Sequence, residues 1–178
     1  VCYGLHAGFL ASAARFPERA ALEVDGRVLT YGALRLEAAK IAEAVQSGQV
    51  GAPQRKVGIL ANRSLAVYAG LLGTLMAGAA IVPLNPGFPA ERTRQMIDQA
   101  SLDVIVVDAK GEHVLDEVLA GVERPLLLIL PHAADLAPHQ AKWPKHRFLA
   151  ADDLVVPSDW MPVSVAPDTL AYIFFTSG

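Results

Sequence analysis

The stretch Ala171-Tyr172-Ile173-Phe174-Phe175-Thr176-Ser177-Gly178 carries the pattern from which the fold of this chain is inferred. Five apolar or aromatic residues run without a charge and give way to Thr, Ser and Gly, which predicts a buried strand with small polar residues at its carboxyl end. In an open parallel sheet, ligands bind at that end. Hydroxyl groups bond phosphate oxygens and glycine admits close backbone N–H groups, but such residues are also common in plain turns. The upstream sequence decides between these two interpretations.

Upstream of this stretch, predicted strands alternate with predicted helices. Short apolar runs predict strands at residues 56–60, 80–84, 103–108 and 126–130. Apolar residues at helical spacing predict helices between them at 65–77, from about residue 90, and at 112–119. Nearer the amino end, the patterns predict a helix over 5–16, a hairpin turning at Asp25-Gly26 and a helix over 31–47. This alternation predicts an α/β fold with a doubly wound, largely parallel sheet.

Local features of these segments carry more specific expectations. Thr30 is expected to cap the helix at 31–47. Ala69, Gly73 and Ala77 form a row of small residues four apart, which would let their helix lie very close to a sheet or another helix. Residues 131–167 are rich in proline and lack clear periodicity, so we expect mostly surface loop and short strand there.

The composition indicates a single globular domain. Hydrophobic residues make up 53% of the 178 residues and charged residues 19%, an apolar excess that suits strands buried on both faces. The net charge is −3 and no basic cluster is present, so nucleic acid is not an expected partner. A single cysteine, Cys2, excludes an internal disulfide, and the first residues lack the pattern of a secretory signal, so we expect a cytoplasmic location.

A charge-free stretch at residues 64–90 is long enough to span a membrane, which keeps that alternative open. However, Gly78, Pro83 and the Asn85-Pro86-Gly87 cluster divide the stretch into a helix, a short strand and a turn. Neither an aromatic belt nor a basic flank brackets it. We therefore expect no membrane segment in this chain.

The common nucleotide-binding and catalytic motifs are absent. The chain has neither G-x-x-x-x-G-K-[ST] nor G-x-G-x-x-G at the start of a helix, which disfavours a P-loop or a dinucleotide-binding domain. The nucleophile elbow G-x-S-x-G fails because Phe175 stands where Ser177 would need a glycine. The five histidines show no zinc-like spacing and are interpreted as surface residues. We therefore name no catalytic residue and no metal ligand in this chain.

Three motifs follow one another in order. They are Leu29-Thr30-Tyr31-x-x-Leu34, then Met76-Ala77-Gly78-Ala79-Ala80-Ile81-Val82-Pro83-Leu84-Asn85-Pro86 with Phe88-Pro89-x-Glu91-Arg92, and finally residues 172–178. In this order they resemble the N-terminal part of the adenylate-forming superfamily, which contains peptide synthetase adenylation domains, acyl- and aryl-CoA ligases and luciferases. The resemblance covers essentially all 178 residues. Phe-Pro-x-Glu-Arg favours the synthetases, although Met76, Ile81 and Asn85 depart from their Lys, Tyr and Asp, and Pro-Leu-Asn-Pro is at least as common in acyl-CoA ligases.

The resemblance implies an ATP-dependent ligase. The parent enzyme would join an amino acid to ATP as an aminoacyl-adenylate, release pyrophosphate, and pass the aminoacyl group to a phosphopantetheine thiol. Thr176, Ser177 and Gly178 match the start of the family's phosphate loop, where Thr-Ser-Gly continues into Ser/Thr-Thr-Gly-x-Pro-Lys. The implied cofactors are ATP, Mg²⁺ and phosphopantetheine. The implied partners are an amino acid or other small carboxylate and a peptidyl carrier protein domain.

By the same resemblance, residues 1–178 would form the N-terminal part of the large AMP-binding domain. The small C-terminal domain that bears the catalytic lysine, and most of the substrate pocket, would lie outside this chain. We therefore expect the chain alone to be inactive. An acyl- or aryl-CoA ligase stays open as the alternative within the superfamily, and a non-catalytic α/β binding module as the alternative from another class.

Overall fold

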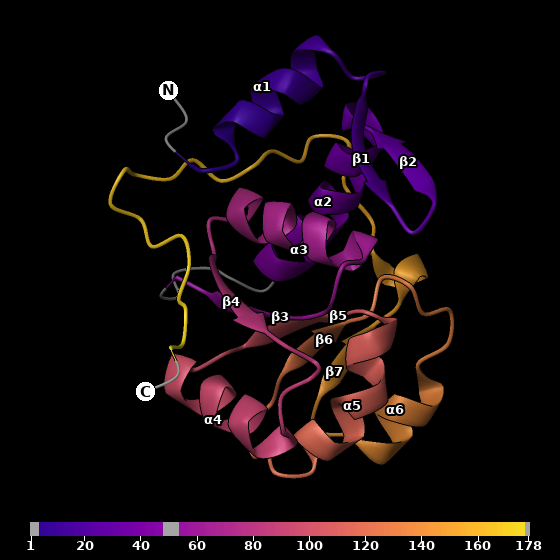
Figure 1. Cartoon of the computed structure of the whole chain (residues 1–178), viewed down its shortest axis with the longest axis vertical. Helices are drawn as coiled ribbons and strands as arrows, with labels where there is room; N and C mark the ends of the chain where they lie inside the picture. The colour runs from indigo at the N-terminus through magenta and orange to yellow at the C-terminus, as the bar shows by residue number, and fades with distance from the viewer. Residues whose placement is uncertain (1–3, 48–53, 177–178) are drawn as a thin grey trace.

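A parallel sheet of five strands forms the centre of the computed structural model, which describes residues 4–47 and 54–176 (Figure 1). In spatial order β4-β3-β5-β6-β7, its strands are β4 (Ala80–Leu84), β3 (Lys56–Leu60), β5 (Val104–Val107), β6 (Leu127–Ile129) and β7 (Arg147–Leu149). A separate antiparallel hairpin consists of β1 (Ala20–Val24) and β2 (Arg27–Thr30). The predicted α/β fold with a doubly wound parallel sheet is confirmed.

Helices cover both faces of this sheet (Figure 1). On one face lie α2 (Tyr31–Gln46) and α3 (Leu65–Met76), with α1 (Ala7–Arg15) packed against α2. On the other face lie α4 (Ala90–Ala100), α5 (Ala109–Leu119) and the short α6 (Ala137–Lys142). A single turn of 3-10 helix (Ala151–Asp153) follows β7. The sheet is therefore the middle layer of three.

The central strands are buried on both faces because successive side chains of a strand point to opposite sides. In β5, Val104 and Val106 pack with α2 and α3, whereas Ile105 and Val107 pack with α4 and α5. All four side chains are fully buried. This burial explains why the strands read as uninterrupted apolar runs rather than as alternating ones.

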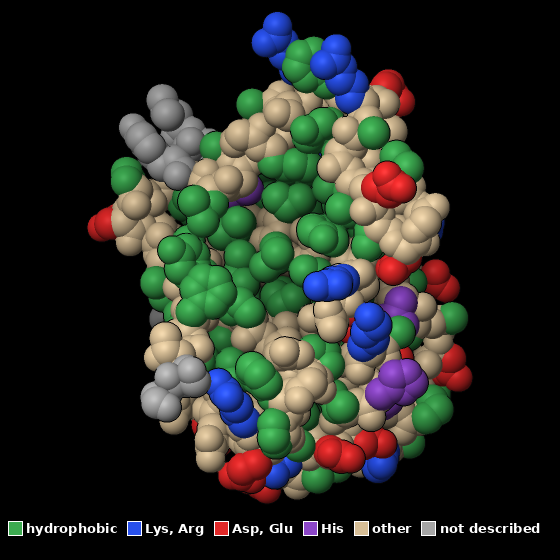
Figure 2. Space-filling view, viewed as in Figure 1, with side chains coloured by type: hydrophobic (Ala, Val, Ile, Leu, Met, Phe, Trp, Pro, Cys, Tyr) green, Lys and Arg blue, Asp and Glu red, His purple; other side chains and the backbone are tan. Residues whose placement is uncertain are grey.

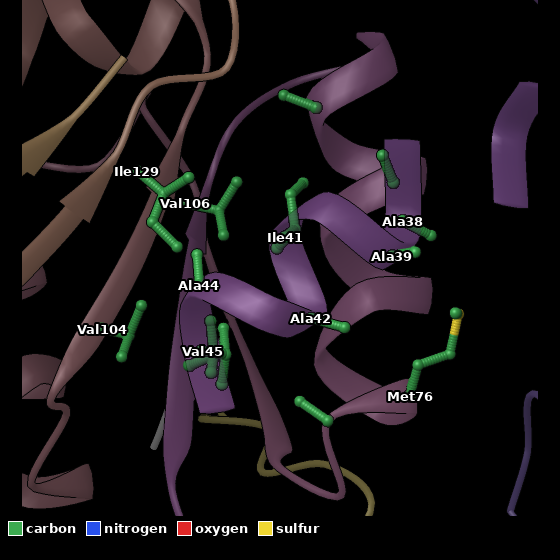
Figure 3. Close-up of a cluster of buried hydrophobic side chains, with 14 of the residues drawn as sticks. Ala38, Ala39, Ile41, Ala42, Ala44, Val45, Met76, Val104, Val106 and Ile129 are labelled. Carbon is green, nitrogen blue, oxygen red and sulfur yellow. The ribbon is translucent and has the colours of Figure 1, made fainter. Parts of the chain in front are cut away.

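Helix α2 is held at its start by a cap and along its length by α3. The side chain of Thr30 accepts a hydrogen bond from the backbone N–H of Ala33 at 3.2 Å, which confirms the predicted cap. Gly73 lets α3 lie close to α2, because a Cβ at this position would lie 2.6 Å from the backbone oxygen of Ala38 and 2.9 Å from Cβ of Ile41. Figure 3 shows Ala38 and Ile41 on α2 alongside α3. The predicted close packing of the small-residue row is confirmed.

Two other predicted segments differ from the structure in their details. Helix α5 begins at residue 109 rather than 112, because the carboxylate of Asp108 caps it by accepting a hydrogen bond from the N–H of Gly111 at 2.7 Å. The region 131–167, predicted as loop and short strand, also contains the helix α6. Its strand β7 extends the parallel sheet beside β6.

The segment 170–176 is not the buried strand that the sequence predicts. It lies along β4 and joins it through an isolated parallel bridge between Ile81 and Tyr172. The side chain of Tyr172 is 50% exposed and that of Phe174 is 65% exposed. Ile173, on the opposite side, packs against the core formed with α4 and α5. The prediction was wrong because a run of apolar residues was taken to mean burial on both faces, whereas here only alternate side chains face the core.

No helix within residues 4–47 and 54–176 is long and apolar enough to cross a membrane. The charge-free stretch at 64–90 forms α3, β4 and the turn that follows β4. Its helical part has 12 residues, whereas a spanning helix needs about 20.

The close contact between α2 and α3 gives a matched pair of substitutions. Gly73→Ala should lower the free energy of unfolding by about 1–2 kcal/mol, because forcing the helices apart costs more than the roughly 1 kcal/mol that alanine gains in a helix. Gly8→Ala is the control, since nothing lies within 4 Å of a Cβ at that position of α1. It should be neutral or stabilising by about 0.5 kcal/mol. Urea unfolding of both variants measures the difference, and a stabilising Gly73→Ala would contradict the tight packing.

Candidate functional site

The carboxyl ends of β3 and β4 and the end of segment 170–176 lie at one edge of the sheet. Leu60 pairs with Leu84 in the parallel register of the two strands, and the bridge at Tyr172 sets the segment beside β4 in the same direction. An open cavity of about 560 Å³ lies at this edge. Its lining is mostly apolar, with Asn62 and Asn85 as the polar side chains. Ligands of open parallel sheets bind at this kind of edge.

The turn after β4 is a compact structure that uses the side chain of Asn85. Its Oδ1 accepts a hydrogen bond from the N–H of Gly87 at 2.8 Å, and its backbone oxygen accepts one from Phe88 at 2.9 Å. The guanidinium of Arg92 lies 4.2 Å from the centre of the Phe88 ring. Asparagine and aspartate both form turns of this kind, so the Asn that stands where the synthetase pattern has Asp leaves the turn intact.

Thr176 lies at this edge, and its side chain is exposed. It follows Phe175, which lines the cavity described above. An exposed hydroxyl at the carboxyl edge suits an interaction with phosphate. The other two predicted site residues, Ser177 and Gly178, lie outside the described residues. Phosphate binding by the three residues therefore stays a prediction.

Asp108 is a buried polar residue at the same edge that the sequence analysis missed. It is 3% exposed. Its Oδ2 accepts hydrogen bonds from the N–H of Asn62 at 2.9 Å and from Oγ of Ser64 at 2.8 Å, while Oδ1 caps α5. An Asp directly after an apolar strand and three residues before Gly111-Glu112 was the available signal for the cap. One carboxylate thus ties the loop after β3 to the start of α5.

A second polar cluster joins α5 to the segment around α6. The carboxylate of Glu112 is 2.7 Å from Nε2 of His132 and 2.9 Å from Nε2 of His139. Nearby, Asp116 accepts hydrogen bonds from Nζ of Lys142 and Nε1 of Trp143, both at 2.7 Å. Burial raises the pKa of Glu112, but the hydrogen bonds from the two histidines outweigh it and leave that pKa below its ordinary value. We interpret this cluster as a structural attachment of α6.

The histidines differ from the prediction that all five lie on the surface. His6 and His146 are each 1% exposed. Nδ1 of His146 accepts a hydrogen bond from the N–H of Leu126 at 3.2 Å. Burial lowers the pKa of both histidines, because it penalises the charged imidazolium. Across residues 4–47 and 54–176, no three His, Cys, Asp or Glu side chains are arranged to hold a metal ion.

The sequence of this chain matches a known protein family. The model of the family described as "AMP-binding enzyme" matches residues 9–178. This chain belongs to the AMP-binding enzyme family. The AMB antimetabolite synthetase AmbB of Pseudomonas aeruginosa is 36% identical over 174 residues, which cover 98% of this chain and 12% of AmbB.

Solved structures share the fold of this chain. IdnL7 is 34% identical with a TM-score of 0.80, over 99% of this chain and 33% of IdnL7. The nonribosomal peptide synthetase FmoA3, in its AMPPNP-bound form, is 26% identical with a TM-score of 0.71, over 99% of this chain and 16% of FmoA3. The predicted resemblance to the adenylate-forming enzymes is confirmed. The chain spans 12% of AmbB and 16% of FmoA3, and thus only a part of the relatives that it matches.

The Glu112 cluster predicts a pH-dependent contribution to stability. Glu112→Gln should lower the free energy of unfolding by about 1 kcal/mol at pH 6, because it removes the charge that the histidines contact. Since the folded pKa lies below the ordinary 4.5, this contribution is complete above that pH and is lost at lower pH. Urea unfolding between pH 3 and pH 6 tests this.

Glu117→Gln on the exposed side of α5 is the matched control and should have little effect at any pH. A Glu112→Gln effect of the same size at the lowest and the highest pH would contradict the assignment.

Proposed function

We propose that the parent protein of this chain activates an amino acid with ATP. It forms an aminoacyl-adenylate, releases pyrophosphate, and transfers the aminoacyl group to the phosphopantetheine thiol of a carrier protein. The observation that carries the proposal is the position of Thr176, an exposed residue at the carboxyl edge of the sheet in a chain of the AMP-binding family. A cytoplasmic location stays a prediction of the sequence.

The contribution of this chain would be to bind and orient the leaving group. Thr176 and Ser177 would donate hydroxyl hydrogen bonds to the β- and γ-phosphates of ATP, and Gly178 would let backbone N–H groups approach them. When bound, Mg²⁺ supplies positive charge that offsets the negative charge of the phosphates. Charge builds up on pyrophosphate as it leaves, so donors that are already in position stabilise the transition state. No catalytic residue and no Mg²⁺ ligand is assigned to this chain.

An acyl- or aryl-CoA ligase is the second candidate, and one local feature favours it. The stretch Pro83-Leu84-Asn85-Pro86 matches a pattern that is at least as common in acyl-CoA ligases. The Asn85 turn does not separate the two classes, because Asn and Asp both accept the hydrogen bond that closes it. The identity of the carboxylate must therefore come from an activity measurement.

We propose further that residues 1–178 form the N-terminal part of a larger AMP-binding domain, and that the rest of this domain covers an apolar face of the chain. Figure 2 shows broad hydrophobic surface in the region of α3 and segment 170–176. Tyr68 on α3 is 39% exposed, and the neighbouring rings of Tyr172 and Phe174 lie 4.9 Å apart, both half exposed or more.

Single domains rarely leave a continuous apolar surface of this kind open to water. The chain spans 33% of IdnL7 and 12% of AmbB, so proteins of its family contain ample sequence to cover this face. The small domain that bears the catalytic lysine is proposed to lie in that remaining sequence as well. Chain 1–178 alone would then lack both its cover and its catalytic lysine.

Carboxylate-dependent exchange of pyrophosphate into ATP tests the proposed reaction in the full-length parent protein. We expect exchange with one or a few amino acids, and none with chain 1–178 alone. Exchange only with fatty or aryl acids would establish the ligase alternative instead. No exchange with any carboxylate would overturn the enzyme proposal and favour a non-catalytic module.

Thr176→Ala in the same protein should lower kcat/KM for ATP by about tenfold, as expected for one lost hydrogen bond to a charged phosphate. Thr169→Ala is the matched control, because Thr169 lies seven positions earlier, before segment 170–176, and is not expected to contact phosphate. Equal effects of the two substitutions would contradict the assigned role of Thr176.

The apolar face can be tested by replacing its exposed rings. Tyr172→Ser with Phe174→Ser should reduce the binding of a fluorescent hydrophobic dye to chain 1–178, but should destabilise the full-length parent by about 3 kcal/mol or more, since buried aromatic rings contribute strongly. Val28→Ser, at a hairpin residue that is 62% exposed, is the control and should change neither property much. An unchanged unfolding midpoint of the doubly substituted parent would show that this face stays uncovered.

A further inference from the structure

The side chain of Asp108 lies at the centre of the sheet edge, at the point where doubly wound sheets commonly bind ligands. In the order β4-β3-β5-β6-β7, the chain adds β4 on one side of β3 and then adds β5, β6 and β7 on the other side. The point between β3 and β5 is where the order of the connections reverses. Helix α3 leaves β3 on one face and α5 leaves β5 on the other, so a crevice opens outside the carboxyl ends of these two strands. Doubly wound sheets of this order bind ligands at this point.

Asp108 occupies this crevice. Its carboxylate receives three hydrogen bonds, from the N–H of Asn62, Oγ of Ser64 and the N–H of Gly111, at 2.7–2.9 Å. These donors stand at the starts of α3 and α5, where backbone N–H groups favour negative charge. The carboxylate therefore satisfies the donors that an anionic ligand would otherwise meet.

The space above Asp108 does not suit a second anion. A cavity of about 260 Å³ opens there, between the hairpin, α2 and the starts of α3 and α5. Asp25 and Glu37 line it together with Asp108, Arg27 and His132. Glu37 is paired with Lys40 at 2.9 Å, which leaves two carboxylates beside one arginine and one histidine. The cavity therefore has no surplus of positive charge to attract phosphate, in contrast to a typical phosphate site.

The loop that Asp108 holds also forms part of that edge. Residues 61–64 connect β3 to α3, and Arg63 within this loop has a left-handed backbone with φ of 51°. The hydrogen bonds of Asp108 flank this residue, at Asn62 and Ser64, and so fix a conformation that costs energy. Asn62 also lines the 560 Å³ cavity, as do Phe174 and Phe175, the two residues before Thr176.

We propose that Asp108 is a positioning residue for Thr176, the residue to which we assign phosphate binding. It fills the central crevice in place of a ligand and fixes the loop of residues 61–64, which supports the cavity wall next to Thr176. This inference rests on the proposed function, because it assigns to Asp108 an effect on ATP binding at Thr176. Asp108 itself does not touch the nucleotide.

The test compares Asp108→Asn with Thr30→Ala in the full-length parent protein. Asparagine still caps α5, but it presents an N–H donor to the loop where Asp108 presents an acceptor oxygen. Thr30→Ala removes the cap on α2, and Thr30 is not among the residues that line the 560 Å³ cavity. We expect Asp108→Asn to raise the KM for ATP in pyrophosphate exchange roughly threefold to tenfold while kcat changes less, as for a misplaced binding group. Thr30→Ala should lower the melting temperature and leave the KM for ATP unchanged.

Two results would overturn the proposal: a KM for ATP that Asp108→Asn leaves unchanged, or one that both variants raise equally. If the wild-type protein shows no exchange with any carboxylate, the proposed function fails instead, and the two failures are thereby distinguished.

A second measurement does not depend on activity. Asp108→Ala leaves the three donors around an empty space, and formate supplies a carboxylate of matching size. Formate at high concentration should raise the melting temperature of Asp108→Ala more than that of wild type or of Asp103→Ala. Asp103 is the control because it precedes β5 at the opposite end and pairs with Arg124 on the surface. Equal responses of the three proteins to formate would show that the crevice does not require an internal carboxylate.

Discussion

Burial of β3 on both faces and along both edges is the constraint from which the rest of the structure follows. Its Val57 and Leu60 are fully buried, and Gly58 is tightly packed, since a Cβ there would lie 2.8 Å from a methyl group of Leu84. A parallel strand of this kind needs helices above and below it. The connection after β3 therefore lies on one face of the sheet and those after β4 and β5 lie on the other, and the loops that leave the three strands gather at one edge.

That edge contains two kinds of polar group with different roles. Asp108 and Asn85 are engaged by the chain itself, one at the centre of the sheet and one in the turn after β4. Thr176 is exposed at the edge beside β4. The internal groups fix the loops, whereas the hydroxyl of Thr176 is exposed to solvent. This division agrees with the proposal that phosphate is bound at the margin of the sheet rather than at its centre.

Features set by nearby residues could be predicted from the sequence. The bounds of β3 and β4 match because each strand is an apolar run closed by turn residues, and the Thr30 cap acts within three positions. Features set by distant contacts could not. Asp108 bonds to residues 46 and 44 positions earlier, which no local pattern reveals. The exposure of Tyr172 was missed for a related reason, because burial of the outer side of a strand depends on what packs against it.

Within the part of the chain that the structure describes, the outer margin of segment 170–176 is an unpaired strand edge, which favours self-association of the chain in isolation. Its partner strand β4 lies on one side, so the backbone groups directed away from β4 present an edge, bordered by the exposed rings of Tyr172 and Phe174. Apolar edges of this kind pair readily with other strands, including those of a second copy. Chain 1–178 in isolation is therefore expected to associate with itself along this margin.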